Sequence, residues 1–113
     1  MRTRAPAAER PERFAIASSR RDGEIVLALR GELDLACVDE LSAAAADIPV
    51  GTGLVVDLTA LDFLDVSGLR ALLNLDRRAR AEGWNLLLKS PRPAVARLFE
   101  LCGCSVGAGQ NAN

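Results

Sequence analysis

The sequence has 113 residues, is 50% hydrophobic and carries a formal net charge of −1. This length accommodates one domain but not two, and the hydrophobic content lies well above the range of disordered chains. The near-zero charge gives no reason to expect nucleic acid or an acidic membrane surface as a partner, and no apolar run is long enough to span a bilayer.

The types of residue present argue against an enzyme. The chain has no histidine, which removes the usual general base, the commonest metal ligand and every Ser-His-Asp arrangement. It has three cysteines, Cys37, Cys102 and Cys104. This odd number does not make a disulfide framework and is typical of reduced thiols, and the close pair lacks the further ligands that a zinc site needs. We therefore expect a cytoplasmic protein without catalytic activity or a metal.

The two ends of the chain differ in composition from its middle. Residues 1–13 are mostly Arg, Ala, Pro and Glu, without an apolar signal core, and predict a disordered lead-in. Residues 105–113 are small and polar and predict a loose tail. One folded domain is therefore expected over residues 14–104.

The first part of this domain predicts a hairpin followed by a helix. Residues 14–18 alternate and favour a strand, and the Asp-Gly pair within residues 21–24 is a turn signal. Residues 25–29 are apolar on both faces, which indicates a strand in the interior of a sheet. The sequence Gly31-Glu32-Leu33-Asp34 interrupts that strand. Its last residue is a candidate N-cap for a helix over residues 35–48, where apolar residues recur at helical spacing.

The middle of the domain predicts a buried strand, an acidic loop and a second helix. The strand is the apolar run at residues 54–58, which is too short for a helix, and Asp57 is expected to end it. Asp62 is expected in the loop and Asp65 beside the helix start. The helix is expected from about Ser67 to Glu82, with the following glycine as its stop. Its apolar face is marked by Val66, Leu69, Leu72, Leu73 and Ala79.

The last part predicts one more strand and one more helix. Residues 84–88 favour the strand, and Ser90-Pro91 is typical of a helix start, a cap followed by proline. An apolar stripe follows to Cys102, and Gly103 is expected to end the helix. The alternation of strands and helices predicts an α/β fold with parallel strands and right-handed helical crossovers, to which the hairpin adds an antiparallel strand.

The segment Asp65-Val66-Ser67-Gly68 places a hydroxyl at the start of the second helix. Backbone N–H groups are unpaired there and the helix dipole favours negative charge, so a phosphate on Ser67 would meet ready-made donors. The local sequence alone is explained as well by Ser67 as an N-cap. Gly68 destabilises a helix interior by about 1 kcal/mol relative to Ala. Its presence suggests a close approach to the backbone, as by a kinase active site or a partner surface.

Two segments of the chain resemble one family of regulatory domains. Gly31-Glu32-Leu33-Asp34 is similar to the Gly-Glu-Leu-Asp that precedes the first helix of the STAS domain family (sulphate transporter and anti-sigma factor antagonist). The stretch from Val56-Asp57-Leu58 to Phe63-Leu64-Asp65-Val66-Ser67-Gly68-Leu69 is similar to the strand, acidic loop and Asp-Ser-Ser-Gly-Leu of that family. The resemblance runs from about Phe14 to Gly103 and is specifically to free-standing anti-sigma factor antagonists.

This resemblance implies a mixed sheet of four or five strands with helices packed against it, and a switch rather than a catalyst. In the family, the second serine of the loop is phosphorylated by an anti-sigma factor that is also a kinase, and Ser67 holds that position. Val66 stands where many members have Ser or Thr. The implied partners are the anti-sigma factor serine kinase and a serine phosphatase. ATP would belong to the kinase, so no cofactor is expected.

The resemblance also implies a partner-binding surface around the first-helix loop and the Ser67 turn. On local evidence, Asp34 is explained as a helix cap and Asp65 as a favourable charge at a helix start. The resemblance adds that they face the partner. The residues expected to bind it are Glu32, Asp34, Asp62, Asp65, Val66, Gly68 and Leu69.

Two alternatives remain beside the antagonist. A response-regulator receiver would use Asp57 and Lys89 at strand ends, but the chain lacks the acidic cluster that would hold magnesium and is a strand–helix pair short. A STAS subunit of a lipid-transport or signalling complex, never phosphorylated, keeps the same fold. An enzyme is not supported, because the sequence offers neither a general base nor a Gly-rich phosphate loop.

Overall fold

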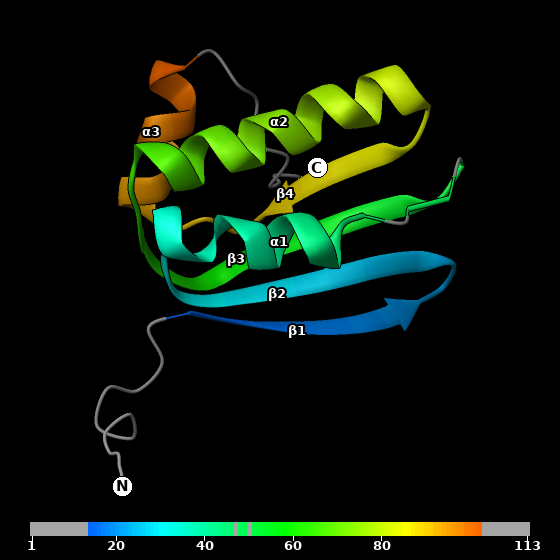
Figure 1. Ribbon diagram of the computed structural model, residues 1–113, viewed down its shortest axis with the longest axis horizontal. Coiled ribbons are helices and arrows are strands. Elements are labelled where there is room, and N and C mark those ends of the chain that lie inside the picture. Colours follow the sequence, from blue (N-terminus) through cyan, green and yellow to red (C-terminus); the bar gives the residue numbers. More distant parts are fainter. Residues whose placement is uncertain (1–13, 47, 50, 103–113) are drawn as a thin grey trace, which may run out of the picture.

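The computed structural model describes residues 14–46, 48–49 and 51–102 (Figure 1). The expected lead-in and tail, and the helix stop at Gly103, lie outside these residues. The elements follow the predicted order. They are β1 (Phe14–Arg21), β2 (Glu24–Leu33), the short 3-10 helix η2 (Leu35–Cys37), α1 (Val38–Ala44), β3 (Gly53–Leu64), α2 (Val66–Glu82), β4 (Asn85–Lys89) and α3 (Pro93–Leu101).

The four strands form one mixed sheet in the order β1-β2-β3-β4, which confirms the predicted fold class. β1 pairs with β2 antiparallel through a tight turn in which Asp22 and Gly23 both have positive φ, 52° and 81°. This is the turn that an Asp-Gly pair favours between hairpin strands. The remaining neighbours, β2 with β3 and β3 with β4, are parallel. The interior position expected of the second strand is therefore confirmed.

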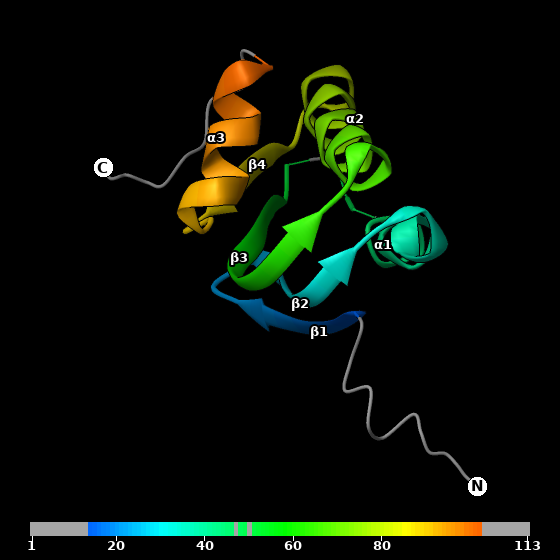
Figure 2. The same ribbon diagram turned by 90° about the vertical axis from the view of Figure 1, so that its left-hand side faces the viewer.

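The three helices pack against the sheet and share one core with it. The connections through α1 and α2 step across the sheet in the same direction, and crossovers of one hand then place their helices on the same face. α1 and α2 do lie side by side there, and α3 packs against β3 at the end of the sheet where β3 leads into α2 (Figures 1 and 2). Side chains from the sheet and from all three helices meet in one hydrophobic core, among them Leu27, Leu41, Leu58, Leu72 and Phe99.

β1 runs to Arg21, three residues past its predicted end, and β2 and β3 also extend beyond theirs. β2 continues to Leu33, so the Gly31–Asp34 segment does not break it, and β3 continues to Leu64 through the segment expected as an acidic loop. Pairing extends to Leu33 with Leu64, across register shifts between Ala28 and Arg30 and between Gly31 and Glu32. Gly31 permits such an irregularity because its φ of 89° is easily adopted only by glycine.

The helix starts also differ from those predicted. The first helical segment is split into η2 and α1 and ends at Ala44 instead of reaching residue 48. α3 begins at Pro93, whereas Ser90 has a φ of 55° and the predicted start at Ser90-Pro91 is wrong. The reason is the second proline, which disfavours helical geometry at Arg92 and is itself suited to the first helical position. Gly83 ends α2 with a φ of 80°, as predicted.

Candidate functional site

The carboxyl ends of β2 and β3 bring two strand-to-helix junctions together. Leu33 and Leu64 are paired at the ends of these strands, and an aspartate follows each of them. The Asp34 carboxylate accepts a hydrogen bond from the Ala36 N–H (3.1 Å) and caps η2. The Asp65 carboxylate accepts one from the Gly68 N–H (2.9 Å) and caps α2. The Asp65 N–H donates to the Leu33 carbonyl (3.2 Å), which links the two junctions directly.

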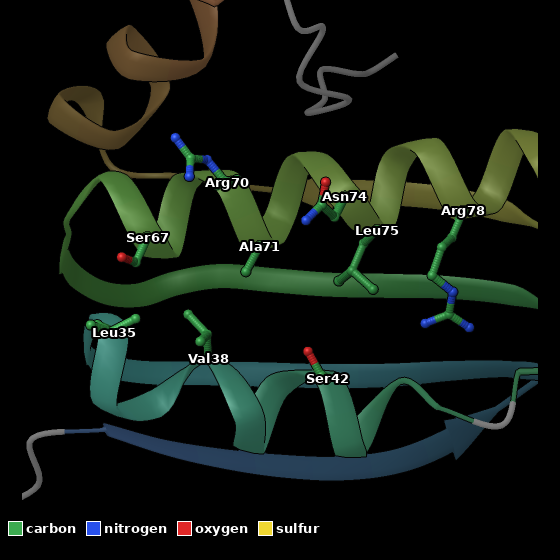
Figure 3. Close-up of a pocket in the computed structure, with 9 residues that line it drawn as sticks. All are labelled: Leu35, Val38, Ser42, Ser67, Arg70, Ala71, Asn74, Leu75 and Arg78. Carbon is green, nitrogen blue, oxygen red and sulfur yellow. The ribbon is translucent and has the colours of Figure 1, made fainter.

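Ser67 is the second residue of α2, because α2 begins at Val66 and Asp65 is its N-cap. The expected position in the first turn is confirmed, and the alternative role of Ser67 as the cap is wrong. The backbone N–H of a residue at this position has no partner within the helix. The side chain is half-buried and lines a groove between α1 and α2, with its hydroxyl at the end of the groove beside Leu35 (Figure 3).

Gly68 is buried, and what approaches it is the chain itself. A β-carbon at this position would lie 2.5 Å from the Leu33 carbonyl oxygen and 2.9 Å from Leu33 Cγ. Glycine is therefore required for α2 to begin so close to the end of β2. The contact with Leu33 explains why a glycine occurs in this helix, and no kinase or partner is needed to explain it. We therefore assign Gly68 a structural role in the site.

Exposed apolar side chains occur on the elements that meet near the serine. Leu35 is 70% exposed, Val66 68% and Phe63 51%. They lie on η2, at the start of α2 and near the end of β3, so all three belong to the same edge of the sheet. Leu69, which the sequence also placed in the partner-binding set, is half-buried and packs against the core. Leu35 and Phe63 were missed by the sequence reasoning, although both fall at positions adjacent to the predicted acidic segments.

The acidic residues of this edge differ in their partners. Glu32 is exposed near the end of β2. Asp62 lies in β3 rather than in a loop, and its carboxylate forms an ion pair with Arg92 (2.9 Å). Arg92 also donates to the Thr59 carbonyl (3.1 Å). The charge of Asp62 is thus balanced by a cation from the segment before α3, a residue that the sequence reasoning did not find.

Asp57 lies within β3, not at its end, and is the register partner of Lys89. Its carboxylate accepts hydrogen bonds from the Thr59 hydroxyl (2.6 Å) and the Thr59 N–H (3.0 Å). Partial burial tends to raise the pKa of Asp57, but the two Thr59 hydrogen bonds and the charge of Lys89 outweigh it, and the pKa is lowered. No group of three or more His, Cys, Asp or Glu that could hold a metal occurs within residues 14–102 as described.

The groove between α1 and α2 has a volume of about 280 Å³ (Figure 3). At the end far from Ser67, Arg78 donates to the Ala45 carbonyl (3.1 Å), lies 5.5 Å from the Trp84 ring centroid and contacts Glu82 (3.5 Å). The first of these contacts ties α2 to the end of α1, and the other two hold Arg78 in place. The groove is lined by Leu35, Val38, Ser42, Ser67, Arg70, Ala71, Asn74, Leu75 and Arg78.

Two further observations concern residues that the sequence analysis singled out. Cys37 is buried and Cys102 is exposed, and both are free thiols, while Cys104 lies outside the described residues. Burial, followed by a hydrogen bond to Asp34, raises the pKa of Cys37. Among the described helices, none combines the length and the apolar character needed to cross a membrane.

Comparison with known proteins identifies a matching family model and relatives of similar sequence. The family model described as "Mlab, STAS domain" matches residues 16–106. The anti-sigma-F factor antagonist RsfA of Mycobacterium tuberculosis is 34% identical over 86 residues, which cover 73% of this chain and 67% of that protein. The putative anti-sigma factor antagonist BtrV of Bordetella bronchiseptica is 33% identical over 84 residues, covering 73% and 72%.

Solved structures of similar shape carry related descriptions. The anti-sigma factor antagonist SpoIIAA in its unphosphorylated form superimposes with a TM-score of 0.67 at 26% identity, over 79% of this chain and 81% of that one. The Bacillus cell fate determinant SpoIIAA in the phosphorylated form gives a TM-score of 0.63 at 25% identity, over 79% and 84%. The similarity thus includes a protein that has been solved in both phosphorylation states.

Proposed function

Because the chain belongs to the STAS domain family, we propose that it is an anti-sigma factor antagonist controlled by phosphorylation of Ser67. The unphosphorylated form binds an anti-sigma factor, and the phosphorylated form does not. The observation that carries this proposal is the position of Ser67, in the first turn of α2 and beside the exposed side chains of Leu35 and Val66. Relatives described as anti-sigma factor antagonists support it.

The docking surface that we propose is the edge of the sheet where β2 and β3 end. Leu35, Phe63 and Val66 supply exposed apolar area, and an interface core is typically apolar with a polar rim. The rim is acidic, formed by Glu32, Asp34, Asp62 and Asp65. A partner that presents apolar side chains within a basic rim would be complementary to this edge.

Phosphorylation changes the chemistry of this surface at its centre. A phosphate adds a charge of about −1.5 to −2 next to the apolar side chains of Leu35 and Val66 and near the Asp65 carboxylate. Unfavourable charge placed in an interface costs several kcal/mol. A loss of about 3 kcal/mol lowers affinity by roughly a hundredfold, which is enough to make the partner exchange this protein for a sigma factor.

The enzymes of the cycle belong to other chains. The anti-sigma factor acts as the serine kinase and supplies ATP, and a serine phosphatase restores the hydroxyl. This protein therefore needs no cofactor and acts in the cytoplasm with its partners, without nucleic acid or a membrane. The alternative is a STAS subunit of a lipid-transport or signalling complex, which would use the same surface without phosphorylation.

The decisive experiment is phosphorylation with purified components. Incubation with the cognate anti-sigma factor kinase and ATP should add one phosphate, located on Ser67 by intact-mass and fragment spectra. The Ser67→Ala variant is the matched control and should remain unmodified. Phosphate on Thr59 or Ser90 with Ser67 untouched would contradict the proposal. A stable complex in which no phosphate is transferred would favour the alternative subunit.

A further inference from the structure

An arginine lies one turn along α2 from Ser67. Ser67 and Arg70 are three residues apart, a spacing that places their β-carbons about 5–6 Å from each other on the helix surface. Both residues line the groove between α1 and α2. Arg70 is exposed, and within the described ranges it forms neither a hydrogen bond nor an ion pair.

Two other arginines, one before α3 and one at the far end of the groove, are already engaged. Arg92 is held by the Asp62 carboxylate and the Thr59 carbonyl. Arg78, at the far end of the groove, is held by the Ala45 carbonyl and Glu82. Arg70 differs from both, because among the described residues no acceptor occupies its guanidinium, which lies one turn from the proposed site of modification.

We propose that Arg70 is the internal counter-ion of phosphorylated Ser67, an inference that rests on the phosphorylation switch proposed above. A guanidinium presents its N–H donors in a planar fork that matches phosphate oxygens, and such charged hydrogen bonds are stronger than neutral ones. In Figure 3 the guanidinium extends outward from α2 and away from the Ser67 hydroxyl. Pairing therefore requires rotation of an exposed side chain and no movement of the backbone.

The pair would hold the phosphate against the first turn of α2. Phosphate oxygens there can also accept from backbone N–H groups that lack helical partners. The consequence is a phosphate whose second ionisation occurs at lower pH than in a peptide, where it lies near 6. The phosphorylated form then stays doubly charged across the neutral range.

The test uses protein in which phosphoserine is inserted at position 67 during translation, so that no kinase is needed. Phosphorus NMR follows the phosphate from pH 4.5 to about 8. Removing an exposed ion pair with Arg70→Gln should raise the apparent phosphate pKa by about 0.3–0.5 units. Arg70→Lys should retain part of the effect, and 0.5 M salt should reduce it. The matched control is Arg77→Gln, which removes the same charge about 15 Å along α2.

Identical phosphate pKa values in the wild-type and Arg70→Gln proteins would overturn the inference. An equal shift in Arg77→Gln would also overturn it, because the effect would then come from net charge alone. The result is independent of whether the kinase modifies Ser67. If the kinase assay fails while the titration shows pairing, the proposed function fails and the Ser67–Arg70 interaction stands.

Discussion

The carbonyl oxygen of Leu33 lies 2.5 Å from the position that a β-carbon on Gly68 would occupy. This contact fixes the start of α2 against the end of β2. It also predicts that Gly68→Ala destabilises the fold, whereas helix propensity alone predicts that it stabilises the fold.

Gly68→Ala should destabilise the fold by about 1–3 kcal/mol, as overpacking typically does, although alanine is the better helix former by about 1 kcal/mol. Urea denaturation would measure the change. Gly53→Ala is the matched control, because a β-carbon there meets the flexible Glu24 side chain rather than backbone. A Gly68→Ala protein more stable than wild type would show that the start of α2 and the end of β2 can move apart easily.

Ser67→Ala should leave the free energy of unfolding within about 0.5 kcal/mol of wild type, as for a surface substitution that removes no cap. Binding to the anti-sigma factor should persist and phosphorylation should be lost, giving a constitutive antagonist. Calorimetric titration and a melting curve would measure both. Asp65→Ala provides the contrast, since loss of the actual cap should cost about 1 kcal/mol. If Ser67→Ala abolished binding without a change in melting, the hydroxyl itself would be a contact.

Ser67→Asp should weaken partner binding, because it places negative charge at the position of the phosphate. The effect should be smaller than that of phosphorylation, since a carboxylate carries about half the charge of a phosphate. Comparison of dissociation constants for Ser67→Asp and the isosteric Ser67→Asn separates charge from size. Equal affinity of wild type and Ser67→Asp would favour the subunit that is never phosphorylated.

Asp34→Ala should lower stability by about 1 kcal/mol, through loss of the hydrogen bond to the Ala36 N–H. If Asp34 also faces the basic rim of the partner, affinity should fall by more than the stability change explains, and the loss should shrink at high salt. We expect this second outcome. Affinity identical to wild type at every salt concentration would remove Asp34 from the docking surface.

Asp57→Asn should make the domain less sensitive to acid. A carboxylate whose pKa is lowered on folding, as that of Asp57 is, stabilises the folded state above its unfolded pKa, and this contribution disappears as the pH falls through the folded pKa. Denaturation at pH 7 and near pH 3 would give the two stabilities. The difference between them should be smaller in Asp57→Asn than in wild type. An unchanged difference would mean that Thr59 and Lys89 do not stabilise the ionised form.

Local sequence patterns predicted the fold well where the spacing of apolar residues and the turn residues indicate one type of element. The hairpin turn at Asp22 and Gly23 and the helix stop at Gly83 depend on positive φ angles that the sequence indicates directly. The extension of β3 to Leu64 was not predictable in this way, because Leu61, Phe63 and Leu64 are held in the strand by pairing with β2, with Asp62 at the irregularity between the first two. That pairing joins strands that are distant in the sequence, so no local pattern reveals it.

The candidate site was predicted in part for the same reason. The sequence placed Ser67 at a helix start, and the structure gives the cap to Asp65. The contact of Gly68 with Leu33 and the ion pair of Asp62 with Arg92 join residues about thirty positions apart. No local pattern distinguishes such a packing requirement from a binding requirement, so the glycine was attributed to a partner.

The attachment of α2 at both of its ends has a consequence for how a signal can be transmitted. Its first turn rests on Leu33 through Gly68, and near its last turn Arg78 is bound to the Ala45 carbonyl. A helix held in this way is poorly suited to sliding or tilting when a charged group is added to Ser67. The two states of the proposed switch should then share one backbone, and the partner would distinguish them by surface charge rather than by shape.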